Sequence, residues 1–407
     1  MKVIAKGWWR RLLLTGIYAL GVFGILASGG SGSSGDRDFI CRLIVQAIAP
    51  ALDGSFDVWV GVLSQTEDGN FDSVVRLNAD GSEQLSFDIG PGGSASAVRT
   101  IAIAADGSND VYVGGDFSKG ILRLNANGTL DPGFAVGTGF NGRVATIVPL
   151  ANGDVYVGGF FDDYDGTLVS GLVRLDSNGM LLFSTAGAGV SNVESIALAR
   201  DGTDDIYSGG LAPPGVGRWS DTLVAQTANF TPAPYSVFSL ATVPLVPLEI
   251  YVGGNFVPGN IVRLNSFNGN TDGGFIVLAG FDADVLSLEL ADAGDIAGDI
   301  YAGGAFKEYQ GTSANGIVRL EVNGDRDFGF DVGSGFTDPD DPASLSKVAT
   351  LAQAVDGSFE VYVGGGFSTY DGVDSNGIAR LNVDGSLDTG FAVQISVDGE
   401  TCSNDTI

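Results

Sequence analysis

Residues 361–391 read VYVGGGFSTYDGVDSNGIARLNVDGSLDTGF, and this stretch combines three features that recur along the chain. It begins with a short run of β-branched and aromatic residues that ends in Gly-Gly. An Ile-x-Arg-Leu-Asn run comes next, followed by an Asp-Gly turn and a Phe. β-Branched and aromatic residues favour strands, and Asp-Gly favours the tight turns of hairpins. The stretch therefore predicts successive antiparallel strands.

The strand that ends in glycine occurs seven times, with 44 to 61 residues between copies. An apolar Val-x-x-Ile or Val-x-x-Leu strand precedes each copy, and an Arg-containing strand and a Phe follow it. Each unit thus predicts four short strands, which we call A to D in chain order. The units lie near residues 45–89, 98–136, 144–185, 193–232, 237–277, 285–332 and 348–393.

Seven four-stranded units predict an all-β fold, a single seven-bladed β-propeller over residues 39–402. A linear stack of the same units would leave a sheet edge unpaired at each end, whereas a closed ring leaves none. The pattern gives no sign of a second folded domain.

The combination YVGGxF…NGIxRLNxDGSLDxxF resembles the bacterial delta-60 repeat, as in residues 364–391. The resemblance extends from Val45 to Val393 and is weakest in the fourth unit, where Arg218-Trp219-Ser220 replaces RLN. It implies a propeller in an exported bacterial protein, and it implies no particular activity.

The N-terminus has the pattern of a secretory signal peptide over residues 1–29. Basic residues precede an apolar stretch of 16 residues, which is short for a membrane span of about 20. A Gly/Ser-rich linker follows over residues 30–38, and residues 403–407 form a C-terminal tail. We therefore expect export to the periplasm, cell surface or extracellular space, with a retained membrane anchor as the alternative.

The composition excludes several classes of function. The 407 residues carry a net charge of −29, which opposes binding to nucleic acids or to anionic membranes. The chain has no His, so His-ligated metals and Ser-His-Asp triads are excluded. Cys41 and Cys402 are the two cysteines, at opposite ends of the predicted ring. In an exported protein they predict a disulfide that closes the ring, with free thiols or pairing between chains as alternatives.

An Arg occurs at the same position of strand C in every unit, and we expect a structural role for it. The predicted structural residues are Arg76, Arg123, Arg174, Arg263, Arg319 and Arg380, with Arg218 at the same position of the irregular fourth unit. Each should pair with an acid of its own unit, such as Asp131, Asp327 or Asp388. A ring of cations that binds an anion is the alternative, and the acidic composition argues against it.

Long loops between strands B and C carry clustered acids in units 1, 3, 6 and 7, and the loop after unit 6 adds more. Units 6, 7 and 1 become neighbours in a closed ring, so one face should be strongly negative there. Loop carboxylates are the oxygen ligands that Ca²⁺ prefers, and solvated acidity is the alternative. The candidate calcium ligands are Asp162, Asp163, Asp165, Asp338, Asp340, Asp341, Asp371 and Asp374.

The functional hypothesis is an exported, non-enzymatic scaffold that presents its acidic loops to a protein or a glycan. No catalytic residue and no cofactor other than calcium is predicted. Two alternatives stay open: a secreted carbohydrate-active enzyme, hydrolase or lyase, that uses paired carboxylates, and a structural protein of the cell envelope. Acids are too numerous in this sequence to single out one catalytic pair.

Overall fold

A computed structural model describes residues 42–66, 69–92, 98–188, 190–211, 215–226, 236–243, 249–257, 259–291, 298–338, 347–397 and 400–403. The predicted signal peptide, the linker, Cys41, Asp340 and Asp341 lie outside these residues. The chain divides between Phe39 and Ile40, and everything below concerns Ile40–Ile407. Its described residues form strands and turns, and no helix among them could cross a membrane.

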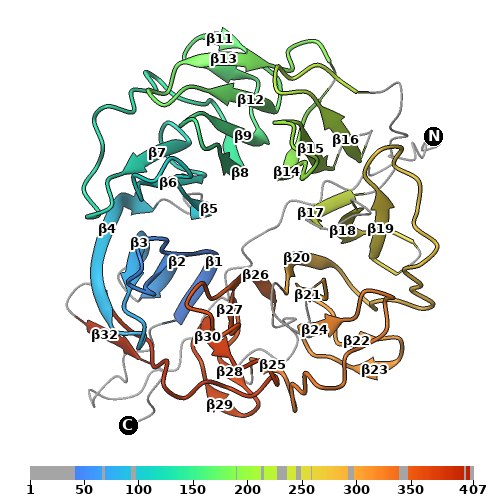
Figure 1. Cartoon of the computed structure of the whole chain (residues 1–407). Helices are drawn as coiled ribbons and strands as arrows, with labels where there is room; N and C mark the ends of the chain where they lie inside the picture. The colour runs from blue at the N-terminus through green and yellow to red at the C-terminus, as the bar shows by residue number, and fades with distance from the viewer. Residues whose placement is uncertain are drawn as a thin grey trace, which may run out of the picture. The chain divides into compact units, whose positions relative to one another are not determined.

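Seven antiparallel sheets follow one another along the described chain, and we number them 1 to 7 (Figure 1). Sheets 1 and 3 have four strands each: β1 Arg42–Pro50, β2 Val58–Thr66, β3 Gly69–Leu77 and β4 Glu83–Gly92 in sheet 1; β8 Arg143–Pro149, β9 Val155–Phe160, β12 Leu172–Leu175 and β13 Leu181–Ser184 in sheet 3. In both sheets the strands lie in chain order from the centre outward.

The other five sheets have three strands each. These are β5 Val98–Ile103, β6 Val111–Gly115 and β7 Ile121–Leu124 in sheet 2; β14 Val193–Leu198, β15 Ile206–Gly210 and β16 Val216–Trp219 in sheet 4; β17 Ser236–Thr242, β18 Glu249–Asn255 and β19 Ile261–Asn265 in sheet 5; β20 Val285–Leu290, β21 Ile300–Gly304 and β24 Ile317–Leu320 in sheet 6; and β26 Val348–Gln353, β27 Val361–Gly365 and β30 Ile378–Leu381 in sheet 7. Strands A, B and C of the sequence analysis correspond to the first three strands, in chain order, of each of the seven sheets.

Small accessory sheets lie beside these seven. They are β10 Asp163–Tyr164 with β11 Thr167–Leu168; β22 Glu308–Tyr309 with β23 Thr312–Ser313; β25 Phe336–Thr337 with β28 Thr369–Tyr370 and β29 Val373–Asp374; and β31 Gln394–Val397 with β32 Glu400–Ser403. Cys402 lies in β32, opposite Ile395. Because Cys41 is not described, the disulfide remains a prediction.

The sheets are arranged around a common centre, with their first strands innermost (Figure 1). Each first strand contacts the first strand of the next sheet, and β26 of sheet 7 contacts β1 of sheet 1. The C-terminal segment also reaches sheet 1, where the Ala392 N–H donates to the Asp80 carbonyl at 2.9 Å.

The paired glycines at the end of strand B let the chain pack closely in two directions. A Cβ on Gly364 would lie 2.5 Å from Val45 Cγ1, so this position is needed for sheet 7 to pack on sheet 1. A Cβ on the next glycine, Gly365, would lie 1.9 Å from the Lys347 carbonyl oxygen of strand A. Strands A and B shift register close to this point in all seven sheets, as expected of a β-bulge.

Strand D differs from the expectation in most sheets. A regular fourth strand forms in sheets 1 and 3, as β4 and β13, whereas sheets 2, 4, 5, 6 and 7 show single bridges in its place. Four units carry Asp-x-Gly-Phe there, and the first oxygen of each Asp accepts the Gly N–H, as in Asp131–Gly133 at 2.7 Å. This Asx-turn bends the backbone away from the ladder, and the Phe folds inward instead.

Candidate functional site

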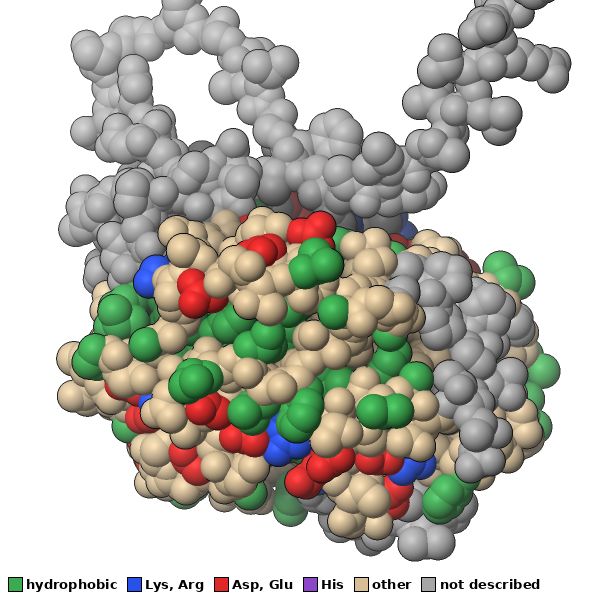
Figure 2. Space-filling model, turned by 90° about the horizontal axis from the view of Figure 1, so that it is seen from above, with side chains coloured by type: hydrophobic (Ala, Val, Ile, Leu, Met, Phe, Trp, Pro, Cys, Tyr) green, Lys and Arg blue, Asp and Glu red, His purple; other side chains and the backbone are tan. Residues whose placement is uncertain are grey.

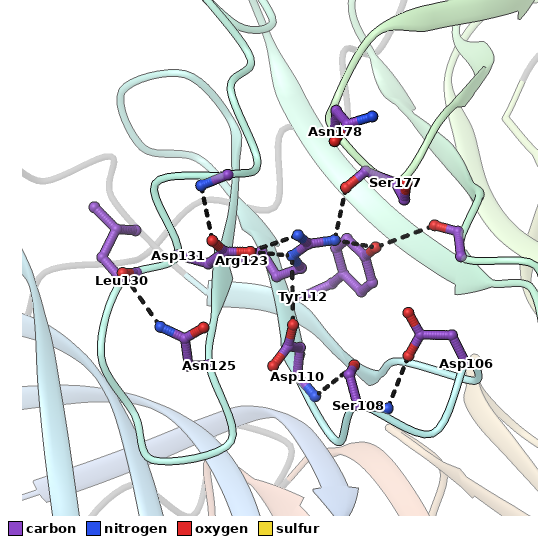
Figure 3. A network of polar contacts seen from close by, with 12 residues as sticks. Asp106, Ser108, Asp110, Tyr112, Arg123, Asn125, Leu130, Asp131, Ser177 and Asn178 are labelled. Atoms are coloured by element: carbon purple, nitrogen blue, oxygen red, sulfur yellow. Dashed lines mark hydrogen bonds and ion pairs between the residues drawn. The ribbon is translucent and has the colours of Figure 1, made fainter.

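Arg123 shows how the repeated arginine is held (Figure 3). Its Nε donates to Asp131 at 2.7 Å, and Asp110 forms an ion pair with it at 3.7 Å. Its Nη1 donates to the Tyr112 hydroxyl at 3.2 Å and to the Ser177 carbonyl at 2.8 Å. Since Ser177 belongs to sheet 3, this one side chain of sheet 2 connects two sheets. We call this arrangement the arginine clamp.

The clamp recurs around the whole described ring. In every sheet the Arg Nη1 donates to a carbonyl oxygen in the turn after strand C of the next sheet. The pairs are Arg76–Ala126, Arg123–Ser177, Arg174–Asp221, Arg218–Ser266, Arg263–Val322, Arg319–Val383 and Arg380–Ala79. The last pair joins sheet 7 back to sheet 1. Each guanidinium also lies over the aromatic ring of strand B, at 5.4 to 5.7 Å from its centroid.

The structure places three predicted pairs in contact: Arg123 with Asp131, Arg319 with Asp327 and Arg380 with Asp388. Sequence reasoning missed a second acid in the clamp. In every unit an acidic residue stands directly before strand B: Asp57, Asp110, Asp154, Asp205, Glu249, Asp299 and Glu360. In six sheets this acid forms an ion pair with the arginine. Its constant position was the signal available in the sequence.

The seventh of these acids, Asp299, predicts a measurable pH dependence. Burial raises the pKa of Asp299 to about 6, and Arg319 offsets part of that rise. The folded state therefore binds this proton more tightly than the unfolded chain does, so stability is lost as pH rises from about 4 through 6. The free energy of unfolding of Asp299→Asn, measured relative to that of wild type, should therefore increase by about 1–3 kcal/mol when the pH is raised from 4 to 7.

Urea denaturation of both proteins at the two pH values measures this difference. Asp325→Asn removes the same charge from an exposed position and is the matched control. A D299N protein whose stability follows the wild-type pH profile would contradict the prediction.

The loops between strands B and C fold into small hairpins over sheets 3, 6 and 7 (Figure 1). Each hairpin is anchored by three aromatic side chains, in which one phenylalanine lies 4.2 to 4.7 Å, between ring centroids, from each of the other two rings. The three sets are Phe140, Phe161 and Tyr164; Phe281, Phe306 and Tyr309; and Phe336, Phe367 and Tyr370. In each set the tyrosine hydroxyl donates to the carbonyl of the glycine in the turn after strand C. The hairpins are therefore fixed against the sheets beneath them.

The six candidate calcium ligands that the structure describes lie over two sheets that are not neighbours. Asp162, Asp163 and Asp165 belong to the hairpin of sheet 3. Asp371 and Asp374 belong to the hairpin of sheet 7, and Asp338 lies close to that hairpin, since the Ser368 hydroxyl donates to it at 3.4 Å.

Several of these carboxylates already accept hydrogen bonds within the loops. Asp165 accepts the Thr138 N–H, and Asp371 accepts the Ser334 N–H, each at 2.8 Å. Among the described residues, no three acidic or Cys side chains gather closely enough to hold a metal ion. Since Asp340 and Asp341 are not described, the calcium site stays a prediction.

A second group of polar and charged residues lies on the innermost strands of sheets 1 to 4, together with Asp116 directly after β6. Arg99 donates to Asp116 and to Gln46, each at 2.8 Å, and Arg143 donates to Glu194 at 2.9 Å. Burial raises the pKa of the Glu194 carboxyl, and the two arginines oppose this rise. Each acid is matched by a cation, so the group has the composition of a structural ion-pair network. Sequence reasoning did not identify it.

Several apolar side chains of sheet 3 and its hairpin are exposed. Leu168 of β11 and Met180, Leu182 and Phe183 at β13 are exposed. Figure 2, which looks onto this side of the molecule from above, shows hydrophobic side chains dispersed among acidic ones.

This fold defines the chain as a β-propeller of antiparallel sheets. The model of a family described as a domain of unknown function (DUF5122) beta-propeller matches residues 105–134, 150–181, 298–330 and 360–391. These segments contain the second to third strands of sheets 2, 3, 6 and 7, and they support a β-propeller repeat family. No curated protein matches the sequence.

Solved structures share the fold at low sequence identity. A catalytically inactive virginiamycin B lyase from Staphylococcus aureus, with quinupristin, has a TM-score of 0.53 at 14% identity over 81% of this chain and 97% of its own. Sqt1 from Chaetomium thermophilum, bound to the N-terminus of a ribosomal protein, has 0.53 at 14% over 79% and 94%. The GH74 enzyme of Niastella koreensis has 0.53 at 13% over 89% and 57%. At this identity the likeness concerns the fold alone.

Proposed function

We propose that the chain is an exported, non-enzymatic scaffold, a seven-bladed β-propeller that binds a protein partner through the hairpins over sheets 3, 6 and 7. The closed series of arginine clamps supports the blade count, because the last clamp returns to the first sheet. Export rests on the N-terminal sequence pattern, and with it the periplasmic, cell-surface or extracellular location and the Cys41–Cys402 disulfide.

The observation that carries the proposal is that the three hairpins share one backbone and differ at their tips. Asp165, Gln310 and Asp371 occupy the same turn position with φ of 48°, 50° and 46°. Three positions further on, the side chains are Leu168, Ser313 and Asp374. A constant framework that presents an apolar, a hydroxyl and an acidic side chain at one position supports a recognition role, because loops on a rigid scaffold commonly carry binding residues.

The structural neighbours fit a binding role without establishing it. Sqt1, in its complex with a ribosomal protein's N-terminus, shows a propeller of similar fold that binds a protein. A lyase and a glycoside hydrolase also share the fold, so a carbohydrate-active enzyme is the alternative. A glycan ligand for the hairpins and a calcium site among their acids are further outcomes that one set of experiments can separate.

The test compares variants at two hairpin tips, Leu168→Ser and Val373→Ser. Leu168 and Val373 are 73% and 50% exposed, so neither change should destabilise the fold. Cross-linking to the wild-type protein in the exported fraction first identifies a partner. The purified partner should then bind the double variant at least about tenfold more weakly than it binds wild type. The matched control is Leu130→Ser, which is 53% exposed and lies in the turn after strand C, at the opposite end of sheet 2.

Four results would contradict parts of the proposal or remove one of its alternatives. Equal binding by the double variant would exclude the hairpins as the contact surface. Specific retention on a glycan array would replace a protein partner with a glycan. Cleavage of a polysaccharide would favour the enzyme. An unchanged melting temperature when calcium is replaced by a chelator would remove the calcium site.

A further inference from the structure

Two turns between strands A and B carry exposed apolar side chains, and they belong to sheets 1 and 7. Residues 51–57 contain Leu52 and Phe56, which are 57% and 45% exposed. Residues 354–360 contain Val355 and Phe359 at the same two positions, 50% and 38% exposed. The equivalent positions are Ala105 and Asn109 in sheet 2 and Arg200 and Asp204 in sheet 4.

The two turns are neighbours, although about 300 residues separate them in the sequence. Their sheets are in contact through β26 and β1. Ala354, at the start of the sheet 7 turn, and Val58, directly after the sheet 1 turn, belong to the same buried cluster. The four apolar side chains therefore belong to neighbouring turns at the same end of sheets 1 and 7, and we call this area the Phe56/Phe359 surface.

The two phenylalanines occupy a backbone conformation that phenylalanine disfavours. Phe56 and Phe359 have φ of 64° and 63°, in the left-handed region, where Asn109 of sheet 2 has 60°. Asn tolerates this region better than a bulky side chain does, and a non-glycine residue there costs about 1–2 kcal/mol. Strain of this kind gathers at functional positions.

The turn itself does not need either phenylalanine. In sheet 1 the Ser55 N–H donates to the Asp53 carboxylate at 3.0 Å, and the Asp57 N–H donates to the Ser55 hydroxyl at 3.2 Å. Sheets 2 and 7 repeat both bonds with their own Asp-Gly-Ser sequences. Asn109 completes this same turn in sheet 2, so the turn does not depend on an aromatic side chain at this position.

The charges around the surface are acidic. Asp53 and Asp356 lie in the two turns, and Asp80 and Asp384 lie in the neighbouring turns after strand C. Hydrogen bonds from Ser55 and, in part, the Arg76 guanidinium hold the pKa of Asp53 at about 2 against the effect of burial, and hydrogen bonds from Ser82 and Ser386 lower the pKa of Asp80 and Asp384. The clamp arginines Arg76 and Arg380 are largely shielded from solvent, and Arg76 forms an ion pair with Asp53, so Asp80, Asp356 and Asp384 carry the negative charge of the rim. A partner therefore meets an apolar centre within a negative rim.

We propose that the Phe56/Phe359 surface is a docking site for a segment of a partner protein that carries apolar side chains flanked by Lys or Arg. The segment's apolar residues cover the two phenylalanines, and its cations face the aspartates of the rim. This surface is at the end of the sheets opposite the hairpins, so it goes beyond the function proposed above. A second copy of this chain is a poor occupant, because it would bring an equally acidic rim.

The test uses a fluorescent peptide with a Leu-Phe-Leu centre between two Lys triplets. Two comparison peptides change one feature each: Glu triplets around the same centre, and Ser-Ser-Ser between the Lys triplets. The full chain should bind the first peptide at least about tenfold more tightly than either comparison peptide, and added salt should weaken binding. The variant F56N/F359N should lose at least about tenfold in affinity for the first peptide.

The same variant gives a second measurement that is independent of any peptide. Because Asn relieves the left-handed strain, the melting temperature of F56N/F359N should rise by about 2–4 °C. The matched control is F267N, since Phe267 is exposed in the turn after strand C of sheet 5 and has no left-handed φ. It should change neither the melting temperature nor peptide binding.

Two results would overturn the docking site. One is equal affinity of wild type and F56N/F359N for the Lys-flanked apolar peptide. The other is equal affinity of wild type for the apolar and the Ser-centred peptides, which would reduce the contact to charge alone. A melting temperature that falls in F56N/F359N would show that the phenylalanines stabilise the fold and would remove the strain argument. None of these three results bears on the binding role proposed for the hairpins.

Discussion

Gly365→Ala should lower the free energy of unfolding by about 3–5 kcal/mol, or prevent folding altogether. The new Cβ would lie 1.9 Å from the Lys347 carbonyl oxygen and 3.0 Å from the carbon of that carbonyl. Lys347 directly precedes β26, and the ladder between β26 and β27 holds Val348 opposite Gly365. Neither strand can move away without breaking that ladder, so the clash must be relieved by opening the bulge.

The next residue provides a matched control. A Cβ on Gly366 would have no atom within 4 Å, and its φ lies outside the left-handed region. Gly366→Ala should therefore change stability by less than about 0.5 kcal/mol. Urea denaturation followed by circular dichroism compares the two variants with wild type. Equal unfolding midpoints for G365A and G366A would show that the close approach at strand B does not hold in solution.

The strands and the paired glycines could be predicted because their signals are local and repeated. Seven copies of one strand pattern indicate sheets of one kind, and Gly-Gly at a strand end indicates a close approach. The role of each glycine could not be assigned, because that depends on geometry: the first glycine packs on the next sheet, and the second packs on its own strand A.

The arginine clamp was only half predictable. An Asp in the same unit can be recognised in the sequence by its residue type, so the pairs with Asp131, Asp327 and Asp388 could be predicted. The second partner is a backbone carbonyl in the next sheet, 64 residues away for Arg319. Every residue has such a carbonyl, so no residue type marks it.

Strand D and the acidic loops show how carboxylates that accept backbone N–H groups can change what a sequence pattern predicts. Phe at a constant position suggested a fourth strand, but the Asp of Asp-x-Gly-Phe uses its carboxylate for an Asx-turn and for the arginine. Asp165 and Asp371 are candidate calcium ligands, a prediction that stays open, and in the structure each already accepts an N–H group from a neighbouring loop. In both cases the competing partner is backbone, which the composition of the loop does not reveal.

The arginine clamps also give a direct test of ring closure. Arg319→Met and Arg380→Met should each lower the free energy of unfolding by about 3–5 kcal/mol, because each leaves buried acids and a carbonyl without their cation. The side chains of Arg319 and Arg380 are only 4% and 12% exposed. Lys307→Met removes the same charge from an exposed side chain and should change stability by less than about 0.5 kcal/mol.

The comparison of the two arginines is what distinguishes a closed ring from an open stack. Arg319 joins sheet 6 to sheet 7, which are consecutive in either arrangement, through a bond of 2.7 Å to Val383. Arg380 donates at 3.0 Å to Ala79 of sheet 1, a contact that exists only if the ring closes. In a closed ring both variants should therefore lose similar stability. In an open stack R380M would lose only the contacts of Arg380 within sheet 7, so its effect should be smaller. A clearly smaller effect of Arg380→Met than of Arg319→Met, measured by urea denaturation, would argue against closure and with it against the seven-bladed propeller.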